Sequence, residues 1–266
     1  MLTFVSALSI LCYLLSSVIL LRRLRPDLAA APGKSIVLLC TFVALLLHAW
    51  ALYATVVTEA GLNLGFTNIS SVAVWFVASL LLIAMMNKPI EALGIIIFPV
   101  TAIVLSIHTT VPTTHIVLNE ARGLSIHILF SILAYSLLGL ACVQAILLST
   151  QERNLHNRHP GGFIRALPAL ETMETLLFQM ISIGFALQTM SLASGFVYLE
   201  DMFAQHIVHK TVLSVVAWLV FATLLWGRWK HGWRGRTAVR WTISGFVTLM
   251  VAYFGSKYVL EILLKR

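Results

Sequence analysis

Long apolar runs follow one another along almost the whole chain, and they constrain its fold more than any other feature. They cover residues 3–21, 35–57, 69–86, 92–108, 123–149, 171–196, 206–227 and 238–262. A helix needs about 20 predominantly apolar residues to cross the hydrocarbon core of a bilayer. Only short polar breaks separate these runs. The sequence therefore predicts an all-α, polytopic membrane helix bundle of about eight transmembrane helices.

Composition supports a membrane protein without a separate soluble domain. Hydrophobic residues make up 59% of the 266 residues and charged residues 11%, whereas a soluble domain is about half apolar and a quarter charged. We expect a single transmembrane domain over residues 1–266, with the lipid bilayer as its first partner. The basic cluster follows the first apolar run instead of preceding it, which favours a retained helix over a cleaved signal peptide.

The basic residues indicate the orientation of the bundle. Twelve Lys and Arg residues lie in the odd-numbered connections between runs, whereas the opposite side has Arg122 and, at the edge of a run, Lys210. Cytoplasmic loops carry the excess of Lys and Arg, so the odd-numbered connections are predicted to face the cytoplasm. Both termini then lie on the extracytoplasmic side. This topology accounts for the net charge of +8, and we expect no nucleic-acid partner.

Sequence motifs for ordinary enzyme chemistry are missing. The chain has no P-loop, no HExxH, no GxSxG and no Gly-rich dinucleotide turn. Its three cysteines, Cys12, Cys40 and Cys142, lie in apolar runs without CxxC or CxxCH spacing. We therefore expect a protein that is not an enzyme.

Histidines are the residues that point to a site. Six of the nine fall in the outer half or the outer loops of the predicted topology. His127 and His209 lie near the outer ends of the fifth and seventh runs, and two imidazoles at matching depth can hold a haem iron between helices. For both, an ordinary interfacial hydrogen-bonding role is an equal alternative. His48 lies deeper, where it fits a second cofactor site, a proton relay or a hydrogen bond to a neighbouring helix.

Two cations flank these histidines. Arg122 shortly precedes His127, and Lys210 directly follows His209. Both could pair with haem propionates, since Arg in particular offers two parallel donors to a carboxylate. The alternative is that their charged ends simply reach the water at the end of a membrane helix.

Several segments also resemble a known family. Residues 209–261, with Gly-Trp-Arg-Gly-Arg at 232–236, and residues 123–135, with Gly-Leu-Ser-Ile-His before Ala-Tyr, carry the likeness. They resemble cytochrome c assembly proteins of the CcsA/HemX type, most of all the HemX-like inner membrane protein branch known as YpjD. The resemblance implies haem handling in the bacterial plasma (inner) membrane, haem b as the cofactor and His127 as a haem ligand.

The chain departs from the larger members of that family in two places. They carry a Trp-rich external motif between the sixth and seventh helices, whereas residues 196–205 contain no Trp. Their last external histidine has no counterpart at 258–266. His209 is our candidate for a substitute ligand.

The sequence thus predicts a haem-binding integral membrane protein that assists cytochrome c biogenesis or haem handling, with haem and cytochrome maturation proteins as partners. One alternative is a permease for a small solute or haem, with His48, Gln179 and Gln188 as its polar residues. Another is a ligand-free accessory subunit of a membrane complex.

Overall fold

A computed structural model describes residues 1–23, 33–59, 61–114, 116–118, 122–157, 167–198 and 208–252. These residues form eight helices and three short strands. The chain divides into two compact units, residues 1–119 with 153–169 and residues 120–152 with 170–266.

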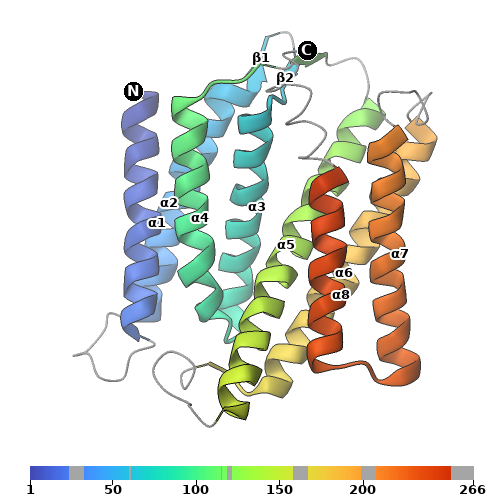
Figure 1. The fold of residues 1–266 in the computed structure, drawn as a ribbon. Helices are drawn as coiled ribbons and strands as arrows, with labels where there is room; N and C mark the ends of the chain where they lie inside the picture. The colour runs from blue at the N-terminus through green and yellow to red at the C-terminus, as the bar shows by residue number, and fades with distance from the viewer. Residues whose placement is uncertain are drawn as a thin grey trace. The chain divides into compact units, whose positions relative to one another are not determined.

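Four helices of 20 to 23 residues form the first unit: α1 Leu2–Arg23, α2 Lys34–Val56, α3 Phe66–Asn87 and α4 Glu91–Thr110. At 1.5 Å per residue each is about 30 Å long, the thickness of the hydrocarbon core. Consecutive helices run in alternate directions, and the N-terminus lies at the end of this unit that carries the strands (Figure 1). At the opposite end of the unit, Glu91 of α4 pairs with Arg23 of α1 at 3.5 Å and with Lys34 of α2 at 3.3 Å.

Pro99 interrupts the hydrogen-bond ladder of α4. Proline has no N–H group, so the carbonyl four residues earlier loses its partner within the helix. That carbonyl belongs to Ile95, and the Ser17 hydroxyl of α1 donates to it at 3.2 Å. In a bilayer no water can replace a lost backbone bond, so the neighbouring helix compensates for the proline.

A small antiparallel sheet of three strands closes the end of the first unit. β1 (Val57–Thr58) and β2 (Gly61–Asn63) connect α2 to α3, and β3 (Ile116–Leu118) follows α4. Leu62 pairs with both Val57 and Val117. The apolar runs gave no sign of this sheet, because strands of two or three residues carry no readable periodicity.

The second unit consists of most of α5 (Arg122–His156) with α6 (Leu170–Tyr198), α7 (Val208–His231) and α8 (Gly235–Met250). Side-chain to backbone hydrogen bonds connect its helices. Gln144 donates to the Met173 carbonyl at 3.0 Å, and the Tyr135 hydroxyl donates to the Leu249 carbonyl at 3.0 Å. With 35 residues, α5 is longer than a bilayer crossing requires.

These helices confirm the predicted all-α membrane bundle. Seven of the described helices are long and apolar enough to cross a bilayer. The eighth predicted run, 238–262, overlaps α8 and continues beyond the described residues. The outward termini and the single transmembrane domain remain predictions from the sequence.

Candidate functional site

His127 lies at the contact between α5 and α6, next to three serines. It is half-buried, five residues after the start of α5. Its Nδ1 atom lies 2.8 Å from the backbone carbonyl oxygen of Ser191 and 3.4 Å from Ser194 Oγ. Ser131, one turn further along α5, lies 2.6 Å from Ser191 Oγ. We call these four residues the His127 site.

The hydrogen bonds of the His127 site assign its protons. Ser131 Oγ donates to the His127 carbonyl at 2.7 Å, and Ser194 Oγ donates to the Ser191 carbonyl at 2.8 Å. Each hydroxyl has one proton, so Ser191 Oγ is the donor in its bond with Ser131. A carbonyl oxygen can only accept, and His127 Nδ1 must therefore carry the proton in its bond to Ser191.

This arrangement determines which nitrogen of His127 is available to a ligand. In a neutral imidazole with its proton on Nδ1, the lone pair lies on Nε2. No described residue makes a hydrogen bond to that nitrogen. Histidines that bind metals almost always donate their other N–H to a carbonyl or carboxylate, which holds the ring in place and raises its basicity. His127 therefore has the hydrogen bonding of a histidine ready to bind a metal.

The other predicted cofactor residues of this unit are only partly described. The backbones of Arg122 and His209 lie in the first turns of α5 and α7, but their side chains lie outside the described part of the structure. Lys210, in the first turn of α7, is half-buried. Their predicted roles as propionate contacts and second iron ligand remain predictions.

His48 lies in the first unit, inside a fully buried cluster with Tyr13 and Ser71. Its Nδ1 atom is 3.3 Å from the Tyr13 hydroxyl, and its Nε2 atom is 2.9 Å from the Ser71 hydroxyl. The three residues come from α1, α2 and α3. Since both ring nitrogens already have partners, the geometry favours a role in holding these helices together over the predicted role in cofactor binding.

His108 shows a different arrangement in the last turn of α4. The Thr55 hydroxyl shares its one proton between the carbonyls of Ala51 and Leu52, so its oxygen accepts from His108 Nε2 at 3.1 Å. His108 Nδ1 is buried and has no hydrogen-bond partner in the described structure. Among the described residues, no group of three His, Cys, Asp or Glu side chains converges as a metal site.

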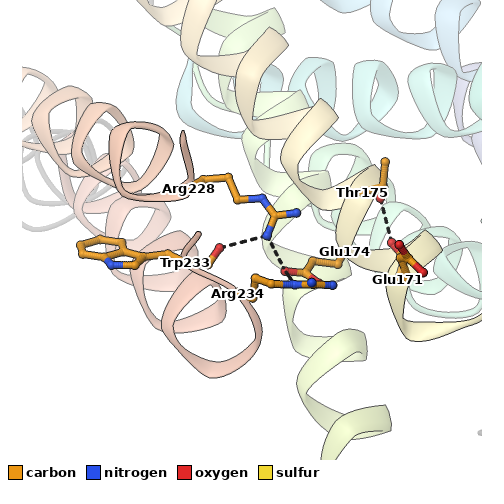
Figure 2. A network of polar contacts seen from close by, with 6 residues as sticks. All are labelled: Glu171, Glu174, Thr175, Arg228, Trp233 and Arg234. Atoms are coloured by element: carbon orange, nitrogen blue, oxygen red, sulfur yellow. Dashed lines mark hydrogen bonds and ion pairs between the residues drawn. The ribbon is translucent and has the colours of Figure 1, made fainter. Parts of the chain in front are cut away.

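A buried carboxylate joins three helical segments at the opposite end of the second unit from His127. Glu174 of α6 accepts hydrogen bonds from Arg228 at 3.2 Å and from Arg234 Nε at 3.0 Å (Figure 2). Arg228 also donates to the Trp233 carbonyl and lies over the Phe178 ring at 4.6 Å. We call Glu174, Arg228 and Arg234 the Glu174 network.

Two glycines allow the backbone to turn between α7 and α8. Gly232 and Gly235 adopt φ angles of +64° and +51°, which side chains with a Cβ atom rarely adopt. Gly232 ends α7, and its N–H donates to the Arg228 carbonyl at 3.1 Å. The Gly-Trp-Arg-Gly-Arg motif thus places Arg234 next to Glu174.

Known proteins resemble this chain over most of its length. The profile of the family described as cytochrome C assembly protein matches residues 36–264. The chain belongs to the cytochrome c assembly protein family. Its relatives include inner membrane protein YpjD of Escherichia coli strain K12, with 31% identity over 233 residues, 86% of this chain and 88% of that protein. No solved structure matches the chain.

Other relatives in the comparison share shorter stretches. Cytochrome c biogenesis protein CcsA of Gloeothece citriformis is 30% identical over 98 residues, which are 36% of this chain and 30% of that protein. A 28.8 kDa protein of Azospirillum brasilense is 32% identical over 143 residues, 53% of each chain. These findings confirm the family resemblance. Together with the seven apolar helices, they identify this member of the cytochrome c assembly family as a multi-pass protein of the bacterial inner membrane.

Proposed function

We propose that this protein binds haem through His127 and assists cytochrome c biogenesis, as a binding protein and not as an enzyme. Membership of the cytochrome c assembly family supports the process. The relative named cytochrome c biogenesis protein CcsA supports it further.

One observation carries the haem assignment: His127 donates from Nδ1 to the Ser191 carbonyl at 2.8 Å and retains a lone pair on Nε2. Haem, when bound, would supply an iron that imidazole nitrogens can ligate. The residues present fit this group, because His127 offers a neutral nitrogen and the Ser191 carbonyl fixes the ring. His209 would supply a second iron ligand, and Arg122 and Lys210 would lie near the propionates.

In this proposal the serines order the region around His127 before haem binds. Ser131 connects α5 to α6 by bonding both the His127 carbonyl and Ser191 Oγ. Ser194 stays within α6 and donates to the same carbonyl that accepts from the ring. Ordering of the ring before a ligand arrives lowers the entropy cost of binding. The site holds the imidazole and its proton, and it forms no covalent bond.

An absorption spectrum tests the proposal. The protein is purified in detergent with and without added haem, as the wild type and as His127→Ala, His209→Ala and His156→Ala. We expect a Soret band in the wild type and in His156→Ala, which changes an exposed histidine at the far end of the same helix α5. His127→Ala should lose most of the band. Its full retention in His127→Ala, or its absence from haem-supplemented wild type, contradicts the proposal.

A further inference from the structure

The end of the second unit formed by the α7–α8 turn carries more positive charge than its carboxylates neutralise. Five basic residues lie there, namely Arg228, Lys230, Arg234, Arg236 and Arg240. Two carboxylates pair with them: Glu174 with Arg228 and Arg234, and Glu152 with Arg236 at 3.8 Å. Counting the exposed Glu171 as well leaves a surplus of two positive charges among the described residues.

Arg234 is held in a geometry that suits an anion. Its Nε atom donates to both oxygens of Glu174, at 3.0 and 3.3 Å, while its side chain is 59% exposed. No other hydrogen bond connects Arg234 to a described residue, so both terminal NH₂ groups are available. A guanidinium can bind two phosphate oxygens at once, and the bond to Glu174 already orders this one.

Exposed tryptophans indicate which anion this surface meets. Trp226 and Trp229, in the last turns of α7, are 53% and 84% exposed. Tryptophan gathers at the level of lipid headgroups at the ends of membrane helices. Lys230 lies one turn beyond Trp226 on the same face of α7, is exposed and has no partner among the described residues. The most abundant anion at that depth is the phosphate of a lipid.

We propose that the α7–α8 turn binds the headgroup phosphate of an anionic phospholipid through Arg234 and Lys230. Arg234 contributes its two terminal NH₂ groups, on a guanidinium that Glu174 holds in place. Lys230 contributes its ammonium group beside the exposed tryptophans. This site is separate from the His127 site and does not depend on haem binding. It explains why a partly exposed arginine is fixed by Glu174, the one carboxylate that is buried among the described residues.

Lipid binding is measured by native mass spectrometry of the purified full-length protein, titrated with phosphatidylglycerol or with phosphatidylcholine. We expect phosphatidylglycerol to bind more tightly to the wild type. Each basic residue near a charged membrane surface contributes about 1 kcal/mol, so Lys230→Gln should weaken phosphatidylglycerol binding about fivefold. Arg234→Gln should weaken it at least as much, and both variants should change binding of phosphatidylcholine less, because its choline cation offsets the phosphate charge. Lys88→Gln, which removes an exposed charge from the first unit, is the matched control.

Three results overturn the proposal. The first is equal binding of the two lipids. The second is unchanged phosphatidylglycerol binding in Lys230→Gln, a variant that breaks no contact of the described structure and therefore should fold. The third is complete displacement of the lipid by an equal concentration of inorganic phosphate, which would assign the site to a soluble phosphate compound.

Discussion

At the scale of single residues, the acceptor that orients His127 is a backbone atom. The carbonyl of Ser191 accepts from His127 Nδ1 whatever side chain residue 191 carries. The tautomer therefore depends on the fit of α5 against α6, to which Ser131 contributes through its bonds to the His127 carbonyl and to Ser191 Oγ. Outer partners of this kind typically change metal affinity 10- to 100-fold when they are altered.

The tautomer of His127 can be observed directly. In the haem-free protein at neutral pH, labelled with ¹⁵N-histidine, we expect His127 to carry its proton on Nδ1, because its partner is a carbonyl. Nitrogen NMR shifts distinguish the protonated nitrogen from the bare one, and His127→Ala identifies the signal. A proton found only on Nε2 is the result that rules out our proton assignment.

Tyr13 tests the buried cluster of the first unit. Tyr13→Phe removes the hydroxyl 3.3 Å from His48 Nδ1 and leaves a buried ring nitrogen without that partner. We expect a loss of about 0.5–2 kcal/mol in the free energy of unfolding, the range for buried hydrogen bonds between membrane helices. Titration with sodium dodecyl sulfate measures it, with Tyr53→Phe, which alters an exposed side chain, as the control. Equal stability of the two variants contradicts a structural role for the Tyr13–His48 bond.

At the scale of the helices, the Glu174 network connects the start of α6 to the end of α7 and the start of α8. One carboxylate with 9% of its side chain exposed serves two guanidiniums. A buried ion pair is costly to form, but removing one partner costs more because the remaining charge is uncompensated. The two arginines reach more water than Glu174 does, which reduces that cost without abolishing it.

Glu174→Gln measures this connection with little change in side-chain volume. We expect a loss of about 2 kcal/mol in the free energy of unfolding, below the usual value for a fully buried pair because the arginines are partly hydrated. Glu171→Gln, one turn earlier in α6 and exposed, is the matched control and should change stability little. If the two variants unfold at the same detergent concentration, Glu174 does not hold these segments together.

At the scale of the whole molecule, the apolar runs predicted the helices because about 20 consecutive apolar residues have few alternatives to spanning a bilayer. The bounds of the predicted runs 35–57 and 92–108 agree closely with those of α2 and α4. The histidine pattern singled out His127 but not its serines, since Ser191 acts through a carbonyl that every residue type has. The sequence also could not predict that Glu174 is buried, because its partners Arg228 and Arg234 lie more than 50 residues away along the chain.

The predicted orientation of the chain can be tested by labelling single cysteines. In a background without Cys12, Cys40 and Cys142, we place a cysteine at Lys88 or at Val111, both exposed at opposite ends of α4. The positive-inside rule predicts that a membrane-impermeant maleimide labels Val111→Cys in intact cells and Lys88→Cys only after lysis. The reverse pattern contradicts outward-facing termini.

Chemical rescue tests the central claim, that His127 ligates haem through Nε2, more directly than any other measurement. His127→Gly removes the side chain from the His127 site, and free imidazole can then enter with a nitrogen for the iron. We predict that the variant purifies with little haem and regains the wild-type Soret band when haem and imidazole are supplied together. A variant that keeps the wild-type spectrum without imidazole contradicts the account, because another residue must then be the ligand.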